Sequence, residues 1–105
     1  MATISYVSAD GPVLNCSNSL LNGITERALT HAQNQEFVLA LEESEWLGDI
    51  NLYLFSAECR MIFAHAADAL SDEVEARSDE FPEYVEKARN IAAEVRETTE
   101  KEGHK

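Results

Sequence analysis

The second half of the chain carries a helical repeat of apolar residues, and this repeat limits the fold more than any other feature. Apolar side chains recur every three or four positions, at Leu52, Phe55, Cys59, Ile62, Ala66, Ala69 and Leu70. Residues at this spacing share one face of an α-helix. We therefore predict a long helix that is capped by Asp49 and ends near Arg77. Met61 and Phe63 fall outside the stripe, so we expect them to pack on a second neighbour or to stay exposed for a partner.

A second long helix is predicted from Pro82 to Glu102. Proline suits the first position of a helix, where its missing N–H is not needed, and the segment 78–82 then connects the two helices. The apolar face of the last helix consists of Tyr84, Ala88, Ile91, Ala92 and Val95. Residues 103–105 are expected to fray.

The first half of the chain is less regular. A helix is predicted from Ser17 or Ser19 to about Gln33, with a break at Asn34. The apolar run 37–41 suits a buried strand or a helix equally well, and the glutamates that follow it lead us to choose a helix over 36–47. Gly48 is placed to end that helix.

The N-terminal residues 1–16 are the least helical part of the chain. Thr3–Val7 predicts a short strand or an extended arm, and Asp10-Gly11-Pro12 predicts a turn. The 105 residues suit a single domain over 1–105. The predicted fold is all-α, a small antiparallel bundle of three to four helices with a short N-terminal strand or arm.

The chain is strongly acidic. Twenty acidic residues against eight basic ones give a formal net charge of −12. Such a charge repels the phosphates of nucleic acids and anionic lipid headgroups, so we expect no direct nucleic-acid or membrane binding. The sequence has no apolar stretch that could span a membrane, and we expect no N-terminal signal peptide, so a cytoplasmic location is predicted. Basic protein surfaces are the natural partners.

The acidic residues are concentrated in the middle of the chain. Residues 36–86 contain fourteen acidic and two basic residues, which gives −12, while charges elsewhere cancel. The densest segment, 68–86, has eight acidic residues and Arg77. Asp72, Glu73 and Glu75 oppose the helix dipole, which costs a few tenths of a kcal/mol each and points to a functional reason for the charge. Solubility alone is the competing explanation.

The residue pattern gives little support for catalysis. His65, Asp68 and Asp72 share a helical face, but this is too few ligands for a metal site, and no metal or cofactor is expected. Glu58 is the one carboxylate near a core stripe, and it is expected to point outward. Cys16 and Cys59 lack CxxC spacing and are predicted to be thiols. An enzyme is therefore the least favoured class, and a deep pocket around Glu58 and His65 would revive it.

We predict an inhibitor whose acidic face occupies a basic, nucleic-acid-binding surface of a target protein. Carboxylates at helical spacing can imitate a row of phosphates and speed association with a basic target. Trp46 is more often a core residue, but aromatic side chains also serve as interface hot spots. The predicted partner-binding residues are Glu42, Glu43, Glu45, Trp46, Asp68, Asp72, Glu73, Glu75, Asp79, Glu80, Glu83 and Glu86. This interpretation requires these carboxylates to form one contiguous field that no cation neutralises.

Small phage-encoded inhibitors, including anti-CRISPR and anti-restriction proteins, and nuclease immunity proteins have a similar size, charge and helicity. The chain carries no motif of these families, and the Asp-x-x-Tyr-Tyr-Pro segment of colicin nuclease immunity proteins is missing. The alternative is a homo-oligomeric helical adaptor or scaffold that dimerises through its two long helices.

Overall fold

The protein folds into four helices packed together with a small three-stranded sheet. The computed structural model describes residues 2–5, 13–77 and 82–103. The predominance of helices and the short N-terminal strand were both predicted and are confirmed. The turn predicted at Asp10-Gly11-Pro12 lies outside the described residues. Within the described ranges, no helix is both long and apolar enough for a membrane crossing.

The sheet consists of β1 (Ala2–Ser5), β2 (Val13–Cys16) and β3 (Asp49–Asn51) in the order β2-β1-β3. Strand β1 pairs antiparallel with β2 and parallel with β3. Side chains alternate across a strand, and Ile4, Cys16 and Ile50 are the buried ones. Asp49 pairs with Thr3 in the sheet, so the prediction that Asp49 caps the long helix is wrong. The long helix begins only at Ala57, eight residues after Asp49. The strand that pairs with β3 is β1, at the N-terminal end of the sequence.

Two shorter helices, α1 (Asn18–Leu29) and α2 (Gln35–Leu47), follow the first two strands. The Ser17 hydroxyl accepts a hydrogen bond from the backbone N–H of Leu20 at 3.2 Å and caps α1. Helix α1 ends earlier than predicted. The helix predicted over 36–47 is confirmed, and Gly48 ends it in the left-handed conformation with φ 69°.

The remaining elements are a 3-10 turn, η1 (Leu52–Leu54), and two long helices, α3 (Ala57–Arg77) and α4 (Pro82–Gly103). Arg60 is buried and donates hydrogen bonds to the carbonyl oxygens of Leu52 and Tyr53, both at 3.0 Å. These bonds fix η1 against the first turns of α3. Pro82 is the first residue of α4, as predicted, and α4 continues through Gly103. Residues 104 and 105 of the predicted frayed tail lie outside the described residues.

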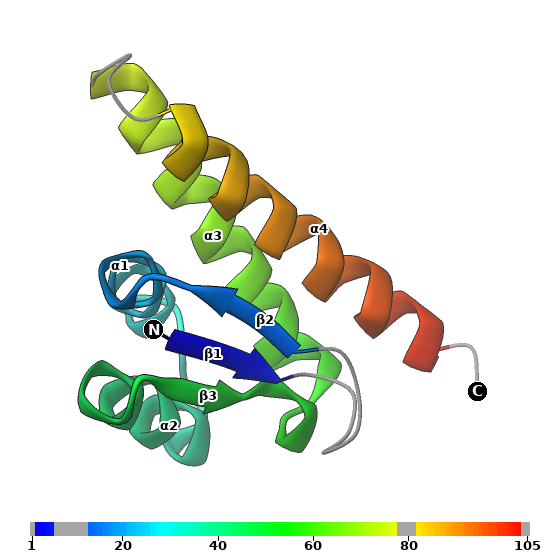
Figure 1. Ribbon diagram of the computed structural model, residues 1–105. Coiled ribbons are helices and arrows are strands. Elements are labelled where there is room, and N and C mark those ends of the chain that lie inside the picture. Colours follow the sequence, from blue (N-terminus) through cyan, green and yellow to red (C-terminus); the bar gives the residue numbers. More distant parts are fainter. Residues whose placement is uncertain (1, 6–12, 78–81, 104–105) are drawn as a thin grey trace.

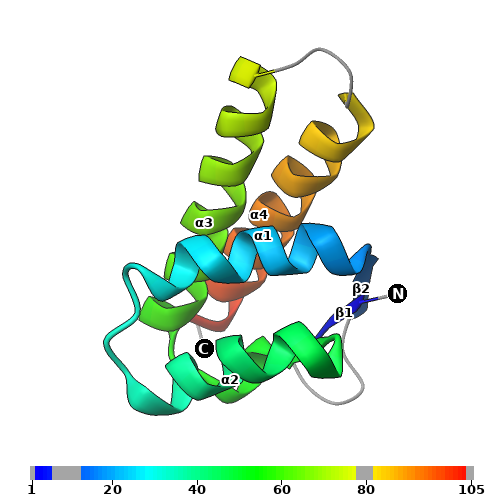
Figure 2. The same ribbon diagram turned by 90° about the vertical axis from the view of Figure 1, so that its left-hand side faces the viewer.

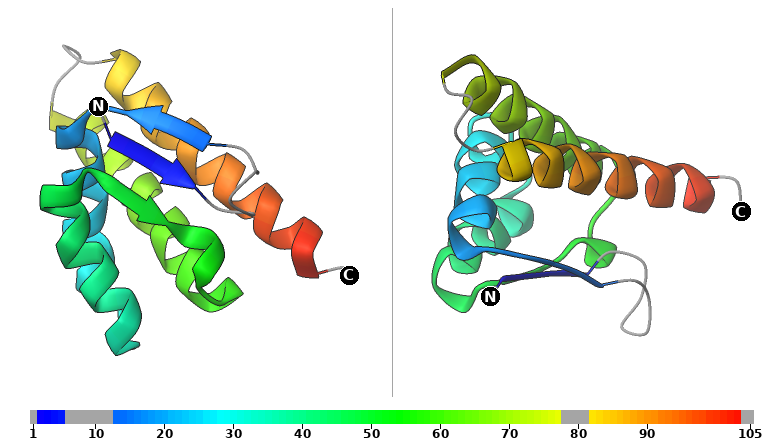
Figure 3. Two further views of the ribbon diagram at one scale, coloured as in Figure 1. Left: turned by 60° about the horizontal axis from the view of Figure 1, so that its bottom comes forward. Right: turned by 45° about the horizontal axis from the view of Figure 1, so that its top comes forward.

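Helices α3 and α4 lie side by side in opposite directions and form the long axis of the molecule (Figure 1). Helix α1 crosses α3, and α2 lies beyond α1 at the periphery (Figure 2). The sheet covers one side of the helices, with β3 next to α2 (Figure 3). Helix α2 therefore packs mainly on α1 and β3.

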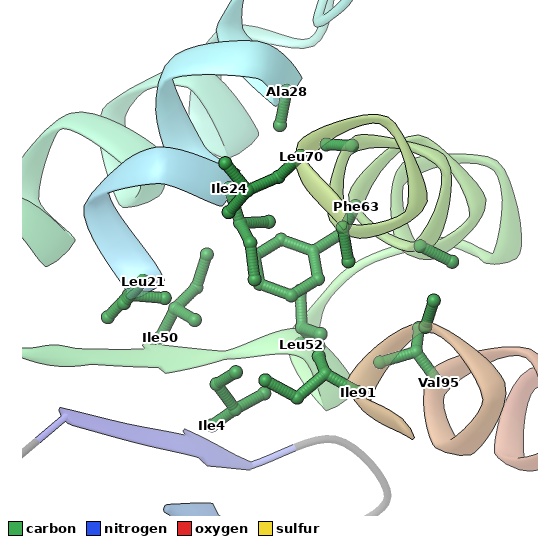
Figure 4. Close-up of a cluster of buried hydrophobic side chains, with 14 of the residues drawn as sticks. Ile4, Leu21, Ile24, Ala28, Ile50, Leu52, Phe63, Leu70, Ile91 and Val95 are labelled. Atoms are coloured by element: carbon green, nitrogen blue, oxygen red, sulfur yellow. The ribbon is translucent and has the colours of Figure 1, made fainter. Parts of the chain in front are cut away.

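The core lies where the sheet, α1, α3 and α4 meet. Figure 4 shows side chains from these elements gathered around the ring of Phe63, which has no exposed surface. The predicted stripe on α3 is confirmed at Cys59, Ala66 and Leu70, which are buried. It is incomplete, because it omits the fully buried Phe63, Ala64 and Ala67, and it wrongly includes the exposed Ala69. Ile62 is only partly buried. The elements that pack on both sides of α3 determine which of its residues are buried. The sequence of α3 alone does not identify these elements.

Candidate partner-binding surface

Helix α2 buries a narrow stripe and leaves a broad outer side. Its buried side chains are Phe37, Leu41 and Ser44, which are spaced by four and three residues along one line. Because successive helical residues turn by about 100°, Leu39 and Trp46 lie on the side of α2 opposite this line. We call the residues Leu39, Glu42, Glu43, Glu45, Trp46 and Leu47 the α2 face.

Large apolar side chains of the α2 face are in contact with solvent. Trp46 is 74% exposed, Leu47 57% and Leu39 56%. Single exposed apolar residues are ordinary, but three on one short helix, one of them a tryptophan, are typical of a contact surface. Tryptophan is also among the residues most enriched at binding hot spots.

Within the part of the chain that the structure describes, no cation forms an ion pair with the carboxylates of α2. Residues 35–51 contain five acidic residues and no lysine or arginine, which gives −5 of the total −12. Among the described residues, no ion pair involves Glu42, Glu43 or Glu45, and all three are exposed. The apolar line of Leu39 and Trp46 is thus bordered by negative charge that no ion pair among the described residues balances.

Both ends of α2 and its inner side are fixed. The Asn34 side chain accepts a hydrogen bond from the Phe37 N–H at 3.0 Å, and the Gly48 N–H donates to the Ser44 carbonyl at 2.9 Å. The Phe37 ring packs against Phe55 with centroids 5.2 Å apart. Caps and aromatic packing of this kind hold a helix in one orientation, so the α2 face is presented without a large ordering cost on binding.

The acidic residues of α3 are in a different situation, because arginines from three helices pair with them. On the side facing α4, Arg96 lies 2.5 Å from Asp68, and Arg89 lies 2.9 Å from Asp72 and 2.7 Å from Glu75. Asp68, Asp72 and Glu75 therefore lie on the face of α3 that packs against α4. The requirement that no cation neutralises them is not met.

Glu73 is paired on the other side of α3. Its carboxylate binds Arg27 of α1 and lies 2.7 Å from Arg77. The hydrogen bond from Arg27 is the main reason why the pKa of Glu73 is lowered. The two carboxylates beside Arg89 likewise raise the pKa of that guanidinium. Four arginines thus balance four carboxylates over residues 68–75.

The other predicted contact residues fall near the start of α4. Glu83 and Glu86 are exposed, and no ion pair within the described ranges includes them. Asp79 and Glu80 lie outside the described residues. The structure therefore brings Glu42, Glu43, Glu45 and Trp46 together on α2 and separates them from the paired carboxylates of α3. The residues predicted from the sequence did not include Leu39 and Leu47. The buried line of Phe37, Leu41 and Ser44 places Leu39 on the opposite side of α2 from the core.

The residues considered for chemistry are scattered. His65 is exposed, with Nδ1 3.4 Å from Nη2 of Arg96. Glu58 is exposed and lines a polar hollow of about 360 Å³ that also includes His31 and Asn34. Within the described part of the chain, no three side chains are grouped as a metal site would require. Burial raises the pKa of the Cys16 thiol, which opposes formation of a reactive thiolate.

Comparison with known proteins does not assign the chain to a group. The chain matches no known protein family, and no characterised protein or solved structure shows significant similarity to it.

Proposed function

We propose that the protein is a binding inhibitor that occupies a basic, nucleic-acid-binding surface of a partner protein. The observation that carries the proposal is the α2 face, where Trp46 is 74% exposed between carboxylates that have no cation beside them in the described residues. Phage-encoded anti-defence inhibitors and nuclease immunity proteins are classes of protein with such a function. Catalysis is not part of the proposal.

The distribution of charge supports a basic partner. Arginines balance the four carboxylates of residues 68–75, so most of the excess negative charge lies on α2, on β3 and along α4. Unbalanced surface charge accelerates association with a surface of opposite sign. A lysine- and arginine-rich surface that binds phosphates carries the required positive charge.

Affinity capture from the source cells tests the proposal. The immobilised protein should retain a basic nucleic-acid-binding protein, and binding of the purified partner should weaken as salt is raised from about 0.05 to 0.5 M. Duplex DNA or RNA should compete with the inhibitor for the partner. A complex that is insensitive to salt, or that binds nucleic acid and inhibitor together, would contradict the proposal.

A matched pair of variants locates the surface. Glu42→Gln/Glu43→Gln/Glu45→Gln removes three charges from α2, and Glu26→Gln/Glu58→Gln/Glu100→Gln removes three from exposed positions outside the predicted partner-binding residues. The α2 variant should bind the partner at least about tenfold more weakly than this control variant does. Sedimentation of the protein alone tests the adaptor alternative, which requires a stable dimer.

A further inference from the structure

We infer that the α2 face docks along a basic amphipathic helix of the partner, with Trp46 as the main anchor. This inference rests on the proposed function and specifies which part of the partner is covered. Nucleic-acid-binding proteins commonly read DNA with a helix that enters the major groove. A helix covered by α2 could not enter that groove.

The shape of the α2 face suits another helix. Its apolar line is narrow, with Leu39 and Trp46 two turns apart and Leu47 at the margin. Helices that pair side by side share such a narrow apolar line, and charged residues beside it choose the partner. The 13 residues of α2 span about 20 Å, which matches four turns of a partner helix.

The flanking charges specify what the partner helix carries. Glu42 and Glu43 lie on either side of the line that joins Leu39 to Trp46. Lysine or arginine residues beside an apolar stripe are their complement. A second copy of this chain is not complementary to the α2 face, because each copy has a net charge of −12 and would place the same carboxylates against each other. Nucleic acid and anionic membranes are excluded by the same repulsion.

A fluorescence titration with defined peptides tests the inference. Trp46 is the only tryptophan of the chain, so its emission reports on the α2 face. The probe is a synthetic peptide of about 18 residues with leucine at helical spacing and lysine elsewhere. Its control has the same composition in a scrambled order that breaks the apolar stripe. The striped peptide should shift the Trp46 emission to shorter wavelength in a saturable way and bind at least about tenfold more tightly than the scrambled one.

Variants of the full chain then identify the anchor. Binding is followed by anisotropy of a labelled striped peptide, since Trp46→Ala has no tryptophan. Trp46→Ala should weaken binding about 30-fold or more, as expected for a hot-spot residue, and Leu39→Ala should weaken it less. Tyr53→Ala, which removes an aromatic side chain outside the α2 face, is the control and should stay within about threefold. Far-UV circular dichroism verifies that each variant is folded.

The outcomes separate the inference from the proposed function. If the striped and the scrambled peptide bind with equal affinity, and this affinity falls only when salt is added, docking of a helix on α2 is refuted. Charge-based inhibition then still stands. If Trp46→Ala and Tyr53→Ala bind alike, Trp46 is not the anchor and the inference also fails. If neither peptide binds at low salt, both the inference and the proposed function are overturned. A dimer with a buried Trp46 would assign the face to a second copy and refute the inference.

Discussion

Replacing Phe63 by alanine should destabilise the protein far more than the same change at its neighbour Ile62. Phe63 is fully buried and lies at the centre of the core in Figure 4, where several elements contact its ring. Ile62 is partly buried at the edge of this cluster. The helical stripe read from the sequence predicts the opposite order, since it contains Ile62 and omits Phe63.

The expected difference is large enough to measure. Removing a buried phenylalanine side chain costs about 3–5 kcal/mol, because transfer free energy is lost and a cavity remains. A domain of this kind is stable by about 5–15 kcal/mol in total, so Phe63→Ala should lose a large share of that stability. Ile62 is already partly in contact with water, so Ile62→Ala should cost about 1–2 kcal/mol.

Urea unfolding followed by far-UV circular dichroism measures both values. The midpoint should fall for Phe63→Ala with little change in the slope m, which would confirm a loss of native-state stability. Near the melting temperature, each kcal/mol corresponds to about 4–8 °C, so heating provides a second reading. An Ile62→Ala variant that loses as much as Phe63→Ala would refute the packing of α3 described above.

Three further predictions concern buried polar groups, a surface ion pair and a helix end. Arg60→Met should lower stability by about 2–4 kcal/mol in urea unfolding, because the carbonyls of η1 lose charge-assisted hydrogen bonds; an unchanged midpoint would show that these bonds are not needed. The lowered pKa of Glu73 means that its ion pairs stabilise the fold above about pH 4.3, and this stabilisation is lost as the pH falls through the lowered value. The melting-temperature gap between wild type and Glu73→Gln should therefore shrink on acidification, and a constant gap would contradict this assignment. Gly48→Ala should cost about 1–2 kcal/mol, since φ 69° disfavours a side chain, and a neutral result would show that the end of α2 adapts.

Local chemistry explains which parts of the helices could be predicted. Pro82 at the start of α4 and Gly48 at the end of α2 act through their own backbone preferences, so a few neighbouring residues suffice to place them. The run 37–41 was ambiguous for a structural reason. Helix α2 carries apolar residues on its buried line and also, at Leu39, on its exposed side, and the mixture hides the helical period.

The candidate site was only partly predictable for a similar reason. Glu42, Glu43, Glu45 and Trp46 were identified because they lie within a few residues of one another, and one helix keeps such residues together. The dense acidic segment of α3 was misleading, because a local count of charges omits Arg27, Arg89 and Arg96. These arginines come from other helices, and only packing brings them within reach.

The sequence alone settled the excess of negative charge, the long helices and the residues at which several of them begin or end. These properties depend on composition and on interactions between residues that are close along the chain. The tertiary structure decided the pairing of β1 with β3, the burial of Phe63, and the division between the neutralised carboxylates of α3 and the unbalanced ones of α2. Each of these depends on contacts between distant segments, and such contacts form only when the whole core assembles.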